Sequence, residues 1–187
     1  HQLELALWLE ADRMGTLLDA LNQENLDNQR DVVKNERRQN VENEPYGLAE
    51  SVTLGEMLYP AGHPYHSPVI GYMEDLTAAT DQDVRDFFTK YYAPGNASLV
   101  IAGDIDIDAT RKMVEKWFSD VPAGKPVPAL TAPTPVLDGV KKKTITDRVQ
   151  LPRLYLAWHT PSQFKPGDAE MDVVSNLLSG GKNSRLY

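Results

Sequence analysis

The chain has 187 residues, with 27 acidic against 19 basic side chains, 13 prolines and no cysteine. The absence of cysteine excludes disulfide scaffolds and cysteine-ligated zinc or iron–sulfur sites. The net charge of −8 argues against binding to a nucleic-acid backbone, because such proteins gather Lys and Arg to displace counterions. No apolar run approaches the roughly 20 residues that a transmembrane helix needs, so we expect neither a nucleic-acid partner nor a membrane span.

Three helices are predicted in the first sixty residues. Apolar residues at intervals of three, four and seven positions predict an amphipathic helix from the start of the chain to about residue 21, which Gly15 could break. A second helix is predicted over about residues 25–43, and Pro45 follows it where proline is usual. A third is predicted over about 45–58.

The middle of the chain combines a loop, a capped helix and a predicted strand. The segment YPAGHPYHSPVIGY is too rich in Pro and Gly for regular structure. Thr80 followed by DQDVRDFFTKYY reads as an N-cap and a short helix with acidic residues in its first turn. The run ASLVIAG, from Ala97, is apolar and β-branched, as in a strand buried on both faces. A helix is predicted directly after it.

The last third contains a proline-rich stretch, two predicted strands and a helix. Residues 121–135 hold five of the 13 prolines, which predicts an extended linker. KKKTITDR and LYLAWHT are predicted strands, and a helix is predicted over about 167–178. Strands combined with helices predict an α+β fold in which layers of helices pack on a β-sheet.

The two ends predict that the chain is an internal piece of a longer protein, with a truncated sheet. The first residue is His1 rather than Met, and the C-terminal SGGKNSRLY stops just after a glycine pair. An unpaired edge of a truncated sheet could pair with another copy, so oligomerisation is expected.

The usual catalytic motifs are absent from the sequence. There is no G-x-S-x-G nucleophile turn and no phosphate-binding glycine loop. A hydrolytic zinc site needs three protein ligands and an open position for water. The four histidines, His1, His63, His66 and His159, do not fall at a metal-binding spacing, and we interpret His63, His66 and His159 as structural.

Glu36 is the most informative single residue. At about 100° per residue, Glu36 lies between Val32 and Val33 around the second predicted helix, within its apolar arc. A carboxylate on an inward face is costly unless it is paired, hydrogen bonded or bound to metal. Two interpretations stay open at this point: a half-buried ion pair with an arginine, or a metal ligand.

Several segments resemble the M16 family of metallopeptidases, the group of insulinase, pitrilysin and mitochondrial processing peptidase. The segments are QRDVVKNERRQNVENEPYGLAESV, GHPYHSPVIGYMEDL and DVRDFFTKYYAPGNASLVIAGDID. The later QLPRLYLAWHTPSQFKPGDAEMDVVSNLLSGGKNSRLY is similar to the start of the second domain of the same proteins. The resemblance runs in one order over nearly the whole chain, and YYAPGNASLVIAGD and LLSGGKNSRLY are its most specific pieces.

The resemblance implies a zinc site to which this chain contributes one residue. M16 peptidases carry an H-x-x-E-H motif whose histidines bind zinc and whose glutamate acts as general base, and a later helix supplies a third ligand, a glutamate. By its position Glu36 resembles that third ligand. Gln29 stands where many members have a second acidic residue that supports the site. No H-x-x-E-H occurs in these 187 residues.

The resemblance also implies a domain division and a function. Residues 1–120 would be the C-terminal part of an M16 N-terminal-type domain, 121–138 a Pro-rich linker, and 139–187 the start of the second M16-like domain. The parent would be a zinc-dependent metalloendopeptidase that hydrolyses peptides, with Zn²⁺ as a cofactor that this fragment alone does not hold and without which it is inactive. The alternative is a non-catalytic M16-like subunit that supports a partner or binds substrate.

The expected partners are a peptide substrate and either a second copy or a paired M16 subunit. The compartment stays open between the bacterial periplasm, which is favoured, and the cytoplasm, because a chain without cysteine suits both.

Overall fold

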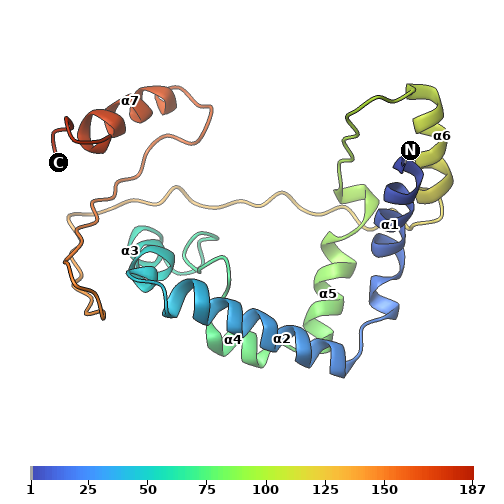
Figure 1. Cartoon of the computed structure of the whole chain (residues 1–187), viewed down its shortest axis with the longest axis horizontal. Helices are drawn as coiled ribbons and strands as arrows, with labels where there is room; N and C mark the ends of the chain where they lie inside the picture. The colour runs from blue at the N-terminus through green and yellow to red at the C-terminus, as the bar shows by residue number, and fades with distance from the viewer. Residues whose placement is uncertain (1) are drawn as a thin grey trace. The chain divides into compact units, whose positions relative to one another are not determined.

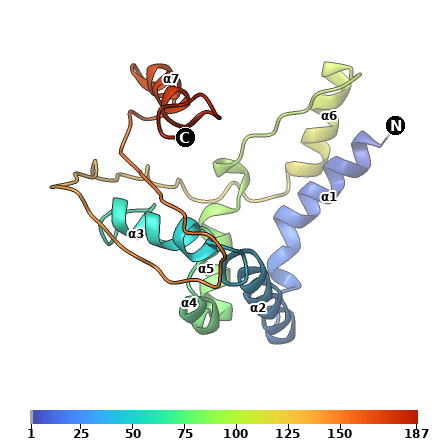
Figure 2. The same cartoon turned by 60° about the vertical axis from the view of Figure 1, so that its left-hand side comes forward.

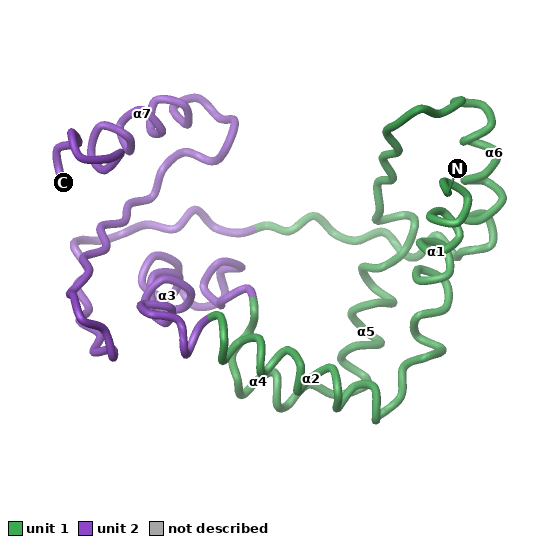
Figure 3. Tube along the Cα trace, viewed as in Figure 1, with its two compact units in different colours: residues 1–40, 70–131 green, residues 41–69, 132–187 purple. Residues whose placement is uncertain are grey.

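The fold consists of helices joined by turns and extended segments (Figure 1). It is known from a computed structural model that describes residues 2–187. The chain divides into two compact units: unit 1 comprises residues 1–40 and 70–131, and unit 2 comprises residues 41–69 and 132–187 (Figure 3). No helix within the described part of the chain is long and apolar enough to cross a membrane.

Unit 1 is built from helices that pack in pairs. Helix α1 packs on α6 and helix α2 on α4, and α1 lies beside α6 in both views (Figures 1 and 2). Leu7 and Ala11 of α1 and Leu26 of α2 are its buried apolar residues. The helices of unit 1 are α1 (Leu3–Thr16), α2 (Gln23–Arg37), α4 (Met73–Ala78), α5 (Asp81–Tyr91) and α6 (Ile107–Phe118), with 3₁₀ turns at Leu17–Asp19 and Pro94–Asn96.

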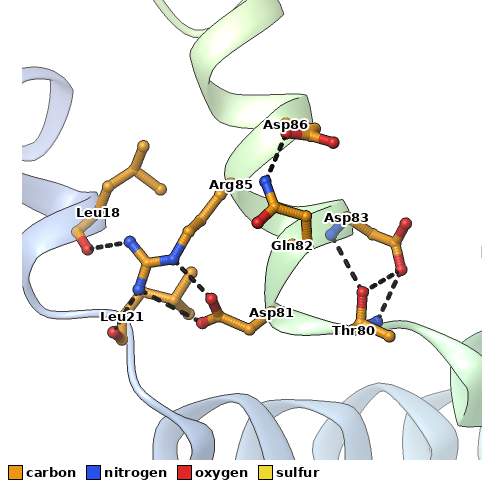
Figure 4. Close-up of polar contacts among 8 residues, drawn as sticks. All are labelled: Leu18, Leu21, Thr80, Asp81, Gln82, Asp83, Arg85 and Asp86. Carbon is orange, nitrogen blue, oxygen red and sulfur yellow. Dashed lines mark hydrogen bonds and ion pairs between the residues drawn. The ribbon is translucent and has the colours of Figure 1, made fainter.

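Side-chain caps begin three of these helices. The side chain of Asn22 accepts a hydrogen bond from the Asn25 N–H at 2.9 Å, and Asp106 accepts one from the Ala109 N–H at 2.7 Å. Thr80 caps α5 as predicted, in a capping box with Asp83 (Figure 4). Each cap satisfies a backbone N–H that has no partner within its own helix.

Arg85 joins α5 to the turn that follows α1. Its guanidinium donates to the carbonyl oxygens of Leu18 and Leu21, at 3.0 and 2.9 Å, and pairs with Asp81 one turn earlier on α5 (Figure 4). A guanidinium has several N–H donors, so this one arginine binds two main-chain carbonyls at once.

Unit 2 combines a helical stretch with a segment, free of helix and strand, that runs along it and back. The helical stretch is the π-helical turn Ala49–Thr53 followed by α3 (Leu54–Leu58), and α7 (Asp168–Ser179) follows later in the chain. We call the extended residues 141–159 the strap. The strap contacts the helical stretch and the turn before it along its length.

The contacts of the strap are polar at one end and aromatic at the other. Lys141 Nζ donates to the Met57 carbonyl at 3.2 Å, and Arg153 Nη1 donates to Glu50 at 2.8 Å. Tyr46 binds the strap twice: its N–H donates to Asp147 at 2.9 Å and its hydroxyl to the Leu151 carbonyl at 2.7 Å. At the other end, the rings of Tyr59 and His159 lie 5.4 Å apart. Val41 is the buried apolar residue of this unit.

The predicted α+β fold, with layers of helices on a β-sheet, is wrong for residues 2–187, which contain no β-strand. The three predicted strands are extended, but none pairs with a neighbour. A strand needs a partner for its N–H and C=O groups, and these segments find none among residues 2–187. Val100 and Leu154 are correspondingly 86% and 80% exposed rather than buried on both faces.

The predicted helices are found, with differences at their ends. The first α-helix ends at Thr16, one residue after Gly15, and a 3₁₀ turn follows at Leu17–Asp19. The second continues into a π-helical turn at Arg38–Glu42, and the last is α7. Helix α4 was not predicted, because its six residues follow a segment rich in Pro and Gly and carry no strong start signal.

Candidate functional site

Glu36 and Gln29 lie seven residues apart on α2 and therefore on the same side of it. Both side chains are exposed. The carboxylate of Glu36 makes no ion pair or side-chain hydrogen bond with any residue in the described range 2–187. Its carboxylate oxygens are therefore not engaged by another described side chain and can act as metal ligands.

The predicted inward orientation of Glu36 is wrong. The buried residues of α2 are Leu26 and Arg37, with exposed fractions of 6% each, whereas Val32 is 50% exposed. At about 100° per residue, Leu26 and Arg37 lie about 20° apart around the helix, and Glu36 lies about 100° from Arg37. The half-buried ion pair between Glu36 and an arginine does not form either.

Two arginines, rather than two valines, define the packed face of α2. Arg30 and Arg37, seven residues apart, both lie within about 40° of Leu26 around the helix. A long arginine stem covers apolar surface while its guanidinium reaches polar partners, so it competes well with a short valine. Sequence reasoning missed both arginines, although their seven-residue spacing on the stripe of Leu26 was a usable signal.

The guanidinium groups of both arginines bind backbone carbonyls at the two ends of α4. Arg30 Nη1 donates to the Ala79 carbonyl at 2.8 Å and lies 3.4 Å from the Thr77 carbonyl. Arg37 Nη1 donates to the Gly71 carbonyl, just before α4 begins. Because the earlier arginine binds the later end of α4, the two helices run antiparallel, and α2 is attached at two points that are two turns apart.

A π-helical turn begins directly after the second arginine. The α-helical backbone ends at Arg37, and Arg38–Glu42 continues with the wider π-helical pattern. Such turns are rare and are found frequently at functional sites. Glu36 therefore lies in the last α-helical turn before a local change in backbone geometry.

The described residues do not form a metal site by themselves. Within residues 2–187, no group of three or more His, Asp or Glu side chains is placed to hold a metal ion. Glu36 suits one position of a zinc donor set, since carboxylate oxygen is a normal zinc ligand and this carboxylate is exposed and unpaired. Gln29 offers an uncharged amide on the same side of α2. His1 lies outside the described residues.

The other three histidines belong to unit 2 and make packing contacts. His63 stacks on the ring of Tyr59 at 4.6 Å and accepts a hydrogen bond from the Tyr65 N–H at 3.0 Å. The ring of His66 donates to the Tyr59 carbonyl at 2.8 Å. His159 packs against Tyr59 from the strap, and its Nε2 is buried without a partner among the described residues. These contacts agree with the structural roles predicted for them.

A second polar cluster, around Glu50, was not predicted. The Tyr155 hydroxyl and the Arg153 guanidinium both bind Glu50, and Arg153 lies over the ring of Tyr46 at 4.0 Å. The hydrogen bond from Tyr155, followed by that from Arg153, holds the pKa of the Glu50 carboxyl below its ordinary value. Loss of hydration raises the pKa of Tyr155. Glu50, Arg153 and Tyr155 bind one another, and the Tyr46 hydroxyl is taken up by the Leu151 carbonyl, so the cluster attaches the strap rather than offering a free reactive group.

Comparison with known proteins identifies relatives along the whole chain. The "Zinc protease PqqE" of Helicobacter pylori is 29% identical over 187 residues, which is 98% of this chain and 41% of that protein. The "Uncharacterized zinc protease YmxG" of Bacillus subtilis is 26% identical over 145 residues, which is 76% of this chain and 34% of that protein. The chain thus spans about two fifths or less of the length of these relatives.

A solved structure and a family model agree with these relatives. The crystal structure of a protease from Helicobacter pylori matches with a TM-score of 0.60 and 31% identity over 72% of this chain and 31% of that one. The family model described as "Peptidase M16 inactive domain" matches residues 78–187, which is more than half of the chain. The chain therefore belongs to the M16 peptidase family.

Proposed function

We propose that the chain is part of a zinc-dependent metallopeptidase that cleaves peptides, and that Glu36 is one of its zinc ligands. The observation that carries this proposal is the exposed, unpaired carboxylate of Glu36, near the end of a helix that is held in place by two arginines. The names of the relatives, which are zinc proteases, support it.

Within this proposal the chain has a limited chemical part. Zinc, when bound, supplies Lewis acidity for hydrolysis. Glu36 supplies one carboxylate oxygen, and the amide of Gln29 lies on the same side of α2, where it can hydrogen bond but adds no charge. The other ligands and the general base would come from residues outside this chain, since no H-x-x-E-H is present. Alone, the chain is expected to be inactive.

The proposal includes the division of the chain into parts. Residues 1–120 would belong to an M16 N-terminal-type domain, 121–138 would link it to the next, and 139–187 would begin the second domain. The absence of any helix from residues 122–138 supports a linker there.

A second candidate function is a non-catalytic M16 subunit that supports a partner or binds substrate, assembled with a second copy or a paired M16 subunit. Two observations favour it. Gln29 carries an amide where many members of the family have an acid, and residues 78–187 match a domain described as inactive.

The test is the substitution Glu36→Gln in the full-length protein that contains this chain. Removing a charged ligand should lower zinc affinity by more than about tenfold and abolish peptide hydrolysis. Zinc bound per chain is measured by atomic absorption after dialysis, and hydrolysis with a fluorogenic peptide. Glu24→Gln, the same change at an exposed position of the same helix, should alter neither.

Two results would redirect the proposal. If Glu36→Gln binds zinc as tightly as the unaltered protein, Glu36 is not a ligand. If the unaltered full-length protein is folded but neither binds zinc nor cleaves peptides, the second candidate function replaces the first.

A further inference from the structure

Glu36 sits on a helix whose orientation depends on two arginine contacts. Arg37 is 6% exposed and directly follows Glu36, yet it lies about 100° away around α2, on the packed side. Its guanidinium donates to the Gly71 carbonyl at the start of α4, and Arg30 donates to the Ala79 carbonyl at the other end. Two attachments separated by two turns fix both the rotation of α2 about its axis and its position along α4.

Rotation of α2 matters because a metal ligand tolerates little displacement. With side chains a helix is about 10–12 Å across, so a carboxylate lies about 5–6 Å from the axis, and a rotation of about 20° moves it by about 2 Å. Metal–ligand distances are set within about 0.2 Å. A loss of rotational control would therefore displace Glu36 by much more than a metal site accepts.

Arginine suits this task better than an apolar residue would. Apolar packing alone would leave the sliding and rotation of α2 along α4 weakly determined, because apolar contacts have no direction. The hydrogen bonds of a guanidinium are directional, and the Gly71 and Ala79 carbonyls that accept them belong to the main chain. The α-helix also ends at Arg37, where a cation interacts favourably with the helix dipole.

We infer that Arg37, supported by Arg30, is a positioning residue that holds Glu36 in the orientation required of a metal ligand. The inference rests on the proposed function. Under this inference, two arginines that do not themselves bind the metal control the metal affinity.

The test compares Arg37→Met with Arg38→Met in the full-length protein. Arg38 is the next residue; it is exposed and binds only the side chain of Asn35, at 2.7 Å, among the described residues. Zinc affinity is measured by competition with a chelator, and the visible spectrum of the Co²⁺-substituted protein reports ligand geometry. Arg37→Met should weaken zinc binding about 10–100-fold, the usual cost of losing a residue that orients a ligand, and should change the Co²⁺ bands. Arg38→Met should change neither.

Two further variants separate positioning from general stability. Arg37→Lys keeps a cationic donor for the Gly71 carbonyl and should recover most of the zinc affinity that Arg37→Met loses. Arg30→Met removes the other attachment and should weaken zinc binding by less, because it lies two turns from Glu36. If Arg37→Met does not fold, Arg30→Met against Arg38→Met makes the same comparison.

The outcomes distinguish this inference from the proposed function. If Glu36→Gln loses zinc while Arg37→Met, or Arg30→Met in its place, matches Arg38→Met in affinity and Co²⁺ spectrum, the positioning role is wrong and the proposed function stands. If Glu36→Gln itself keeps full zinc affinity, both are overturned.

Discussion

The two units of this chain hold together by different means. Unit 1 packs helix on helix, buries Leu7, Ala11 and Leu26, and binds main-chain carbonyls with arginine side chains. Unit 2 attaches an extended strap to a short helical stretch through exposed polar and aromatic contacts, and leaves Leu154 80% exposed. A regular apolar stripe lets a helix bury its surface against a neighbour, whereas an extended segment without paired strands does not. Unit 1 is therefore expected to resist unfolding better than unit 2.

Leu7→Ala tests the core of unit 1 and should have the largest effect on stability. Leu7 is 3% exposed on α1, so its truncation should cost about 2–4 kcal/mol and speed amide exchange in α1 and α6. Hydrogen exchange and urea unfolding measure these changes. Leu9→Ala, at a position 51% exposed on the same helix, is the control. Equal losses in both variants would mean that unit 1 has no distinct core.

Arg85→Met tests the polar attachments of unit 1 and should have an intermediate effect. The substitution removes hydrogen bonds to the carbonyls of Leu18 and Leu21 and the ion pair with Asp81 while keeping an apolar stem. Because the site is half-exposed, we expect a loss of about 1–2 kcal/mol, measured by thermal unfolding. Arg111→Met, on α6, removes an exposed arginine that makes no such bonds within residues 2–187, and it should leave the melting temperature unchanged.

Protonation of Glu50 tests the attachment of the strap. It should have the smallest effect on stability, because exposed ion pairs contribute little to the free energy of unfolding. The pKa of Glu50 is lowered in the folded chain from 4.5 by Tyr155 and then Arg153. Its contribution to stability is therefore fully present above pH 4.5 and is lost as the pH falls through the lower, folded pKa.

NMR titration from pH 7 to pH 3 can follow this loss. The ring signals of Tyr155 and Tyr46 should change with a midpoint below pH 4.5, and Glu50→Gln should remove the transition. A midpoint at or above 4.5 would show that the cluster does not hold the strap in solution.

Local signals predicted helices well and sheet structure badly. Thr80 lies at the start of α5 as predicted, because its hydroxyl and the Asp83 carboxylate act within four residues of sequence. The run from Ala97 has the composition of a buried strand, but a strand needs a pairing partner, and the run pairs with no other segment in the described part of the chain. The predicted fold class failed for that reason.

The candidate site shows the same division between local and tertiary effects. Resemblance to the M16 family selected Glu36 and Gln29, and the comparisons confirm the family, while the zinc role of Glu36 stays a prediction. Helical periodicity alone predicts Glu36 on the inner side of α2, because it predicts that Val32 and Val33 face the core. The structure buries Arg37 instead.

The sequence by itself determined the family and the positions of most helices, because caps, breakers and helical spacing act between near neighbours. Only the tertiary structure decided which face of α2 is buried. Arg30 and Arg37 find carbonyl partners on either side of α4, some 34 to 49 residues later in the chain, so the arginine face of α2 is packed and the carboxylate of Glu36 is exposed. A hydrogen bond to a main-chain group far along the sequence does not alter the spacing of apolar residues in the helix, so it can be recognised only in the folded chain.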